Sequence, residues 1–431
     1  MTEVWLIGMV VMLAVILVGV PIAFAMALLG FLGTATIVGW KPAFGMIAQI
    51  TYDTGLSYEL SVVPLFILMG NFVTRSGLSE ELYRASNAWL GHLRGGLAMA
   101  TVVACAGFSS VCGSSLATAA TMAKVAMPSM RRYGYADSLA TGSIASGGTL
   151  GILIPPSVIM VIYGITTGTN IGKLFMAGII PGLIGMLGYM AAVAYTTWRD
   201  PSLGPPGARA GWGERFKALN GVWGVLSLFV LVIGGIYLGV FTATEAAGIG
   251  AFGAFLIALV KRTLSWRGLY DVLVDSARTT SMMFVVLIGA IIFSNFVNLA
   301  GLPNVLQNYV QSLALTPMLV ILFILVVYLI LGCILESLSM VLLTVPIFFP
   351  LIVSLGFDPI WFGIIVVVVT EISLITPPVG LNVFVLRAVL PDVNTGTIFK
   401  GIMPFLGADI IRLALLVLVP WISLVLPSMM R

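Results

Sequence analysis

The chain has 431 residues, of which 60% are hydrophobic and only 8% are charged, and its mean hydropathy is +1.14. Soluble domains carry roughly 25% charged residues, so the composition excludes an ordinary soluble protein and indicates a polytopic one in a lipid bilayer. The net charge of +4 gives no reason to expect nucleic-acid binding. One histidine and three cysteines, in no metal-binding spacing, do not favour a histidine-based metal centre or a haem site.

The first half of the chain, residues 1–197, is expected to form one set of membrane segments. Its predicted crossings cover residues 4–20, 22–40, 60–74, 138–163 and 174–197. Two apolar arms within residues 96–128 are too short to span a bilayer, which needs about 20 residues, and they predict a re-entrant helical hairpin. The 138–163 span is interrupted by Pro155-Pro156, which predicts a broken helix.

A linker and a second set of segments follow. Residues 198–217 are rich in proline, glycine and arginine, and they predict a helix-free cytoplasmic linker. The second set, residues 218–431, is expected to cross the membrane at residues 219–240, 244–260, 280–298, 359–386 and 401–426. It contains an uncharged amphipathic stretch at 301–314 and a second predicted hairpin at about 317–353, and the 359–386 span is broken at Pro377-Pro378.

The two halves repeat each other at a nearly constant offset. Residues 71–78 match residues 295–302 at an offset of 224; Pro128, Gly134 and Pro155-Pro156 match Pro350, Gly356 and Pro377-Pro378 at an offset of 222; and residues 178–181 match residues 401–404. Chance similarity between apolar helices does not keep its register across separated motifs, so we interpret the halves as an internal repeat.

The distribution of charge predicts that the repeats are inverted. Lysine and arginine gather in the loops near 75–94, 131–132, 198–217 and 261–278, which places these loops in the cytoplasm. The first hairpin then enters from the cytoplasm. Three spans separate the linker from the stretch at 301–314, so the second hairpin enters from outside, and the N-terminus is expected outside as well. Inverted repeats are typical of secondary transporters, which bind their cargo at the repeat interface near the midplane.

The tips of the hairpins and the Pro-Pro breaks carry the chemistry. The first tip lies in a stretch of glycine, alanine and hydroxyl residues at 107–122, and its Ser114-Ser115 aligns with Glu336-Ser337 in the second. Each Pro-Pro pair follows its tip by 41 residues. Proline leaves backbone carbonyls without partners, and freed carbonyls with hydroxyl groups suit Na⁺, while the positive ends of half-helices suit a carboxylate. The alternative is a pair of kinked helices packed by small residues.

Several charged residues in apolar segments raise a separate question. A carboxylate at membrane depth costs at least ~2.5 kcal/mol on insertion scales, so Glu336 is expected either to cap a half-helix, to line the site or to carry a proton. Glu371 raises the same alternatives. Asp409 and Arg412, three residues apart on one predicted helix, read as a local pair.

At these motifs the sequence resembles the large membrane (M, DctM-like) subunit of TRAP (tripartite ATP-independent periplasmic) transporters. The matching stretches are residues 113–120, 148–157, 171–175, 178–182 and 376–382. The resemblance covers essentially the whole chain. It implies an all-α fold of the ion-transporter superfamily with two inverted repeats, and elevator-type alternating access. It also implies a bacterial inner-membrane, Na⁺-coupled symporter for organic acids such as C4-dicarboxylates or sialic acid, and not an enzyme.

The resemblance further implies partners and site residues. The partners would be a small four-helix membrane subunit and a periplasmic substrate-binding protein. The Na⁺ ligands would come from Gly113, Ser114, Ser115, Gly148, Thr149, Ser337, Thr376, Pro377 and Gly380, in two or more sites. The residues facing the substrate carboxylate would be Ser114, Ser115, Thr118, Glu336, Ser337 and Asn382. Because Glu336-Ser337 differs from Ser114-Ser115, the two sodium sites are not expected to have equal roles.

Three other function classes compete with a secondary transporter. An intramembrane enzyme needs a nucleophile with a base, or a metal cluster, at membrane depth, and the chain offers neither pattern. In a cation channel Glu336 would select ions, but two dead-end hairpins fit alternating access better. An ATP-driven pump is disfavoured because the sequence contains no Gly-x-x-x-x-Gly-Lys-[Ser/Thr] segment.

Overall fold

The computed structural model describes residues 4–313 and 315–430, and all regular secondary structure in these residues is helical. The ends of three expected segments, residues 1–3, 314 and 431, lie outside the described residues. The helices of the first half are α1 (Val4–Leu17), α2 (Ile22–Val38), α3 (Trp40–Leu56), η1 (Glu59–Ser61), α4 (Val62–Arg75), α5 (Leu78–Leu90), α6 (Gly96–Cys112), α7 (Ser115–Arg132), α8 (Asp137–Thr149), η2 (Leu150–Ile152), α9 (Val158–Thr167) and α10 (Ile171–Arg199).

The second half begins with the short turn η3 (Pro201–Leu203). Its further helices are α11 (Trp212–Leu219), α12 (Trp223–Phe229), the π-helical turn η4 (Val230–Gly234), α13 (Gly235–Tyr237), α14 (Ala243–Val260), α15 (Trp266–Leu299), α16 (Leu302–Ser312), α17 (Pro317–Gly332), α18 (Ser337–Ser354), α19 (Pro359–Ile375), α20 (Leu381–Val389), α21 (Thr395–Leu418) and α22 (Trp421–Met429). By length and composition, five described helices could cross a membrane, or seven if each of two bent helix pairs counts as one span.

The helices form two groups. The first, here called the frame, contains α1–α4 and α12–α15. Its helices pack in pairs that each combine the two halves of the chain, because α2 packs along α15 and α14 packs along α4. The second, here called the hairpin bundle, contains α6–α10 and α17–α21. Within it α8 packs against α6 and α7, and α19 packs against α17 and α18. In each half one amphipathic helix, α5 or α16, leads from the frame into a hairpin.

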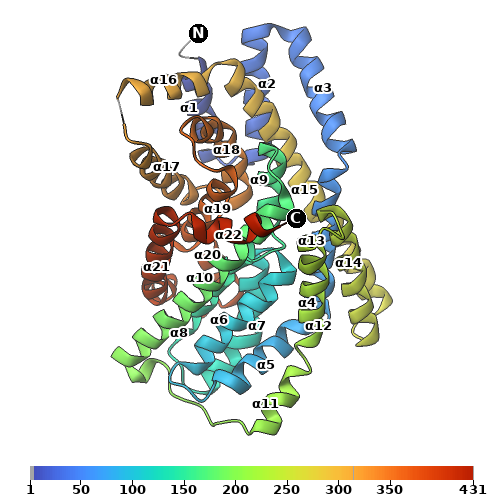
Figure 1. The fold of residues 1–431 in the computed structure, drawn as a ribbon, viewed down its shortest axis with the longest axis vertical. Coiled ribbons are helices and arrows are strands. Elements are labelled where there is room, and N and C mark those ends of the chain that lie inside the picture. The colour runs from blue at the N-terminus through green and yellow to red at the C-terminus, as the bar shows by residue number, and fades with distance from the viewer. Residues whose placement is uncertain (1–3, 314, 431) are drawn as a thin grey trace.

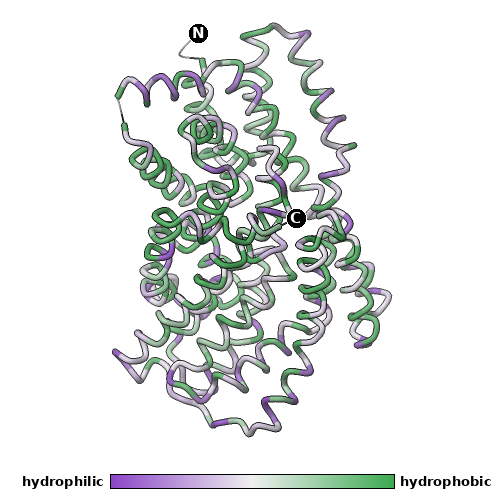
Figure 2. The backbone as a smooth tube through the Cα atoms, viewed as in Figure 1, coloured by the Kyte–Doolittle hydropathy of each residue, from purple (hydrophilic) through white to green (hydrophobic). Residues whose placement is uncertain are grey.

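The hairpins enter the molecule from opposite ends. In Figure 1, α6 and α7 lie in the lower half and α17 and α18 in the upper half, with α11 at the bottom and α16 at the top. Figure 2 shows hydrophobic residues through the middle of the molecule and hydrophilic ones gathered toward its two ends. The expected all-α fold with inverted repeats, re-entrant hairpins and broken helices is therefore confirmed.

Contacts between loops indicate that the segments rich in lysine and arginine lie together at one end of the molecule, here called the basic end. Lys261 is paired with Glu81, and Arg75 lies 3.5 Å from Asp271, so the start of α5 and the loop before α15 adjoin. The linker joins the same end, because its Gly204 carbonyl accepts a hydrogen bond from the Gly95 amide at 2.9 Å. The loops rich in lysine and arginine thus meet on one face, as the charge pattern requires of cytoplasmic loops.

Two expectations about elements were wrong. Residues 40–56 were not expected as a separate segment, yet they form α3, which meets the following helix pair η1–α4 at a bend of 58°. The linker is not free of helix, since its end forms α11. The first turn of α11 is stabilised by Glu214, whose carboxylate accepts a hydrogen bond from the Gly211 amide at 3.2 Å, the three-residue spacing of a capping box.

Glycines allow the closest helix crossings in the hairpin bundle. A Cβ on Gly142 of α8 would collide with the Gly401 carbonyl of α21, and a Cβ on Gly401 would collide with the Ser138 carbonyl. Backbones this close exclude any larger side chain, as is common where helices pack within membranes. The crossing therefore fixes the first broken helix, α8–α9, against a helix from the other half.

Candidate functional site

Both hairpin tips face one cavity of about 310 Å³. Its lining comes from α4 (Ile67, Gly70, Asn71), the first tip (Cys112, Gly113, Ser114, Ser115, Leu116, Ala117), the first broken helix (Ile152, Val158, Ile159), α15 (Thr279, Met283) and the second tip (Glu336, Ser337, Leu338). Of the residues expected at the site, five line this cavity: Gly113, Ser114, Ser115, Glu336 and Ser337. The two serine-bearing bends therefore meet between the frame and the hairpin bundle.

The first tip is held by its own hydrogen bonds and by the first broken helix. Gly113 ends α6 with a positive φ of 66°, which glycine adopts without strain. Ser114 caps α7, where its hydroxyl accepts a hydrogen bond from the Ala117 amide at 3.4 Å. A Cβ on Gly151 of η2 would lie 2.6 Å from the Ser114 carbonyl oxygen, and a Cβ on Gly113 would lie 2.8 Å from that of Pro156. Backbone oxygens of the tip and of the break therefore converge.

Thr118 does not line the cavity. It is fully buried, and its hydroxyl donates to the Ser114 carbonyl at 2.8 Å. Gly148 lies behind the tip as well, since a Cβ there would approach Ala119 of α7 to 2.8 Å. Both residues support the tip from the side away from the cavity.

The second tip has a similar shape and a different chemistry. Glu336 occupies the N-cap position of α18, and its carboxylate accepts a hydrogen bond from the Ser339 hydroxyl at 3.3 Å. Glu336 thus both lines the cavity and bonds to the first turn of α18. The neighbouring Cys333 thiol lies 3.6 Å from the Pro377 carbonyl, which places this tip against the second broken helix.

The second broken helix, α19–α20, carries three expected ligands near its break. The Thr376 hydroxyl donates to the Ile372 carbonyl at 2.6 Å. Pro377 is exposed, and Gly380 begins α20 with a positive φ of 61°. These residues lie beside the second tip and outside the lining of the cavity.

Asn382 connects the two broken helices. It is fully buried, its side-chain amide donates to the Ala145 carbonyl of α8 at 3.0 Å, and its side-chain oxygen has no hydrogen-bond partner. An unpaired buried amide oxygen is costly unless a ligand or water satisfies it. Asn382 was expected to face the substrate carboxylate, but it does not line the cavity between the tips.

Sequence reasoning missed two polar residues of the lining, Asn71 and Thr279. Asn71 of α4 donates to the Ser276 hydroxyl of α15 at 2.8 Å, which ties the two frame helices together beside the cavity. Asn71 and Asn295 occupy equivalent positions of the internal repeat. The same polar residue at the same place in two apolar helices was the signal that could have identified Asn71.

A fully buried charge cluster lies within the hairpin bundle. Arg412 of α21 contacts Glu371 of α19 at 2.7 Å and Asp409 at 2.8 Å, and all three side chains are at most 2% exposed. Tyr189 of α10 donates to Asp409 at 2.8 Å, and its hydroxyl lies 3.0 Å from that of Thr149. The cluster thus reaches from Thr149, at the break of one helix, to Glu371 in the other broken helix. The expected local pair of Asp409 and Arg412 is present, but as part of a larger network.

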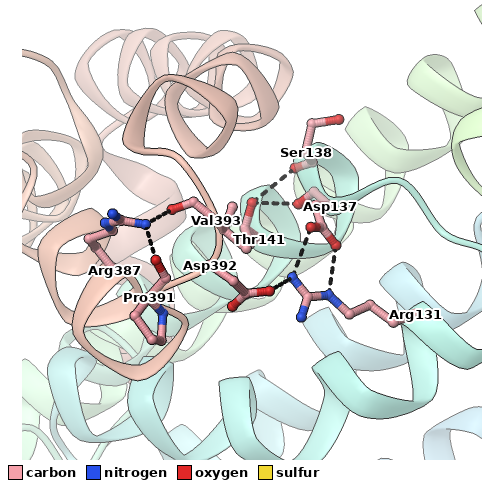
Figure 3. A network of polar contacts seen from close by, with 8 residues as sticks. All are labelled: Arg131, Asp137, Ser138, Thr141, Arg387, Pro391, Asp392 and Val393. Atoms are coloured by element: carbon pink, nitrogen blue, oxygen red, sulfur yellow. Dashed lines mark hydrogen bonds and ion pairs between the residues drawn. The ribbon is translucent and has the colours of Figure 1, made fainter.

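A second network joins the two halves at the basic end of the hairpin bundle (Figure 3). Arg131, at the end of α7, forms two hydrogen bonds of 2.9 Å with Asp137 and an ion pair of 2.5 Å with Asp392. Asp392 lies in the loop between α20 and α21, where Arg387 donates to the Pro391 and Val393 carbonyls. The Arg131 hydrogen bond lowers the pKa of Asp392 below its ordinary value.

The donor set around the tips consists of hydroxyls, an amide and backbone carbonyls, with Glu336 as its one carboxylate. Within residues 4–313 and 315–430, no group of three or more histidine, cysteine or acidic side chains is placed to hold a metal ion. Neutral oxygen ligands suit a hard monovalent cation, whereas zinc and other transition metals favour nitrogen and sulfur ligands.

Comparison with known proteins decides the family. The family model described as "Tripartite ATP-independent periplasmic transporter, DctM component" matches residues 9–422. The chain belongs to this family. Because that component is a membrane permease, the TRAP chain is a multi-pass transport protein and not an enzyme.

Named relatives of this TRAP component match it over nearly its whole length, and one of them is longer. The C4-dicarboxylate large permease protein DctM of Pseudomonas aeruginosa is 39% identical over 93% of each chain. The sialic acid large permease protein SiaM of Vibrio cholerae is 32% identical over 93% of this chain and 97% of its own. The isethionate permease protein DctMQ of Oleidesulfovibrio alaskensis is 35% identical over 95% of this chain but only 64% of its own.

Solved structures agree on the fold. The Alcanivorax borkumensis YdaH transporter superposes with a TM-score of 0.66 over 89% of each chain, at 16% identity. At this identity the likeness concerns the fold alone, and it agrees with the all-α membrane fold that the sequence predicts.

Proposed function

We propose that this TRAP component is the membrane-embedded transport subunit of a Na⁺-driven symporter that imports an organic acid across the bacterial inner membrane. The observation that carries the proposal is the single cavity lined by both hairpin tips, which enter from opposite ends of the molecule. A site closed from each side by a different dead-end hairpin suits alternating access, in which one tip at a time opens.

The chemistry around the tips supports cation coupling. On the first side, carbonyls of the tip and of the break converge around Ser114 and Pro156. On the second, the Pro377 carbonyl contacts Cys333 beside the second tip, and Thr376 and Gly380 flank the same break of the helix. Such oxygens are the ligands that the half-helix sites of secondary transporters use for Na⁺. We therefore assign one cation to each side, with Ser115 and Ser337 as ligands from the tips.

The substrate class follows from the cavity and from the relatives. The helices α7 and α18 both begin at residues that line the cavity, and helix N-termini attract anions. The relatives are named for C4-dicarboxylate, sialic acid and isethionate, all organic anions. An organic carboxylate bound near Ser114 and Ser337 fits both observations. The carboxylate of Glu336 would repel any further anionic group of the substrate that lay close to it.

Partners follow from the family. A TRAP large component is expected to receive its substrate from a periplasmic binding protein and to pair with a small four-helix subunit. The relative named DctMQ is longer than this chain, as a fusion with such a small subunit would be. We further propose elevator movement, in which the hairpin bundle slides against the frame and carries the cavity with it.

The test is uptake by proteoliposomes that contain both membrane subunits, with the binding protein outside and a Na⁺ gradient imposed. Candidate acids are first selected by thermal shift, because a true ligand stabilises the complex in proportion to ln(1 + [L]/Kd). Ser115→Ala and Ser337→Ala should each raise the Na⁺ concentration for half-maximal uptake about tenfold, since each loses one cation contact.

The matched control is Ser281→Ala, which removes a serine of α15 that does not line the cavity and should behave like the native protein. Uptake that is independent of Na⁺, or tip variants with native Na⁺ dependence, would contradict the proposal. Currents through the reconstituted protein at single-channel size would replace it with a channel.

A further inference from the structure

Arg215 of α11 is a buried cation without a counter-charge. Its side chain is 5% exposed, and its Nε and Nη2 have no hydrogen-bond partner. Among the described residues, no carboxylate lies within ion-pair distance of it. Its guanidinium lies 5.6 Å from the centre of the Trp89 ring and 5.2 Å from that of Trp212. Aromatic faces attract the cation but leave its N–H donors unsatisfied.

A large apolar cavity begins beside this arginine. It has a volume of about 680 Å³ and is enclosed by α5, α6, α10 and α12. Trp89 and Leu219 lie at the end next to Arg215, and Ile154, at the break of the first broken helix, belongs to the same lining. Arg215 does not line the cavity itself, but Trp89 belongs to the lining and also contacts Arg215, so the unpaired cation lies next to the Trp89 end of the cavity.

The dimensions of the cavity match one lipid tail. Its lining on α10 extends from Ile179 to Met190, a rise of about 17 Å at 1.5 Å per residue. Half the hydrocarbon core of a bilayer is about 15 Å thick. A single acyl chain of one leaflet therefore fits the length, and the absence of lining charges fits its chemistry.

The cavity is open sideways. Leu183 and Leu187 of α10 are 48% and 58% exposed, and Leu226 of α12 is 44% exposed, although all three belong to the lining. A chain from the surrounding bilayer can thus enter between α10 and α12 without passing through the protein. Arg215 lies at the basic end of the molecule, on the helix α11 at the end of the linker that also contains Arg209.

We propose that this site binds an anionic phospholipid of the leaflet at the basic end, with its phosphate on Arg215 and one acyl chain in the cavity. The planar guanidinium can pair with phosphate oxygens through two parallel hydrogen bonds. Because the protein covers Nε and Nη2 in this structure, the pairing requires the neighbouring side chains to move aside when the lipid binds. Tryptophan is enriched at the membrane interface, where Trp89 and Trp212 would flank the headgroup. The bound chain fills the space between α12 of the frame and α6 and α10 of the hairpin bundle.

The test counts lipids on the complex of both membrane subunits, purified in mild detergent, by native mass spectrometry with added phosphatidylglycerol or phosphatidylcholine. The native complex should retain one phosphatidylglycerol about fivefold more strongly than phosphatidylcholine, the preference expected for one arginine near a lipid surface. Arg215→Gln should abolish this preference. Arg209→Gln, which changes an exposed arginine of the same linker, should leave it intact.

Leu183→Trp provides a second variant that keeps Arg215 and narrows the entrance to the cavity. It should lose the retained lipid of either kind, and its melting temperature shows whether the fold is preserved. Native phosphatidylglycerol retention in both Arg215→Gln and Leu183→Trp would overturn the proposal. Disulfide cross-linking of Leu183→Cys to the small subunit would overturn it too, because a protein helix would then cover the cavity. None of these readouts depends on Na⁺ or on uptake.

Discussion

Arg412 is the residue on which the buried charge cluster depends. Removing its side chain leaves Glu371 and Asp409 buried with no counter-charge, and neither side chain reaches water. Breaking a buried ion pair in this way costs about 3–5 kcal/mol. We expect Arg412→Met to lower the free energy of unfolding by that amount, measured by denaturation of the detergent-purified protein.

Arg132→Met is the control at this scale, because Arg132 is exposed at the end of α7, and surface substitutions change stability by less than about 0.5 kcal/mol. Equal stability of the two variants would show that the cluster is not held by charge. The double variant Arg412→Met with Glu371→Gln should recover part of the loss, since it removes one of the two stranded carboxylates.

The sequence predicted part of this cluster and could not predict the rest. Asp409 and Arg412 are three residues apart on one helix, a spacing that reveals a pair without knowledge of the fold. Glu371 was noticed only as an acid in an apolar segment. Tyr189 lies in an apolar helix, where an aromatic residue is an ordinary hydrophobic contact, so its role depends on a tertiary neighbour 220 residues away.

Gly151 is the position at which the first broken helix meets the first hairpin. A Cβ there would lie 2.6 Å from the Ser114 carbonyl and 2.9 Å from the Ser115 amide, and neither backbone atom can move without shifting the tip. We expect Gly151→Ala to raise the Na⁺ requirement of uptake by at least about tenfold, because a 1 Å displacement of a binding group can cost 10²-fold. The assay is the same proteoliposome uptake.

Gly45→Ala serves as the control for Gly151→Ala. Gly45 lies within α3, and no atom lies within 4 Å of a Cβ placed there, so alanine should slightly favour the helix. If Gly151→Ala left Na⁺ dependence and uptake unchanged, the tip and the break would not form a common cation site.

At the scale of elements the hydrophobic pattern predicted most helices and missed α3. This helix carries Lys41, Gln49 and Asp53, which lower its hydropathy below that of a typical crossing. The internal repeat explains α3. At the repeat offset, the bent helix pair from Trp40 to Arg75 corresponds to the single 34-residue helix α15 of the second half. Extending the repeat toward the N-terminus of each half would have found α3, whereas hydropathy alone could not.

The Arg131–Asp392 ion pair acts at the scale of the whole molecule, because it joins an end of the first hairpin to a loop of the second half (Figure 3). Arg131 lowers the pKa of Asp392 below the ordinary value of 3.8. The pair therefore stabilises the folded state fully above that pH and loses its contribution as the pH falls through the lowered pKa. Since Asp392 is exposed, the contribution is small.

We expect Asp392→Asn to lower the melting temperature slightly at pH 7, with the difference from the native protein disappearing as the pH falls through the lowered pKa of Asp392. The measurement is a melting curve at each pH. Asp53→Asn, which changes an acid of α3 that forms no ion pair among the described residues, is the control. A difference that grew as the pH fell would contradict the assigned sign.

The inverted arrangement of the halves was predictable because the constant repeat offset and the positions of the basic loops can both be read from the sequence. The cavity between the tips was predictable only in part. Ser114, Ser115, Glu336 and Ser337 were identified from their position in apolar hairpins, but Asn71 and Thr279 reach the cavity from the frame. Contacts between the frame and the hairpin bundle have no signature in either segment taken alone.

The bend of 58° before α4 has no equivalent in the uninterrupted α15. Turning the molecule upside down therefore does not superimpose it on itself, although its hairpins nearly exchange places. In a carrier that alternates between facing inward and facing outward, perfect inverted symmetry would make the two orientations equal in energy. The bend removes this equality. The two facing states of such a carrier would then differ in energy before any solute or ion gradient is applied, and the bend between α3 and η1–α4 would be one source of that difference.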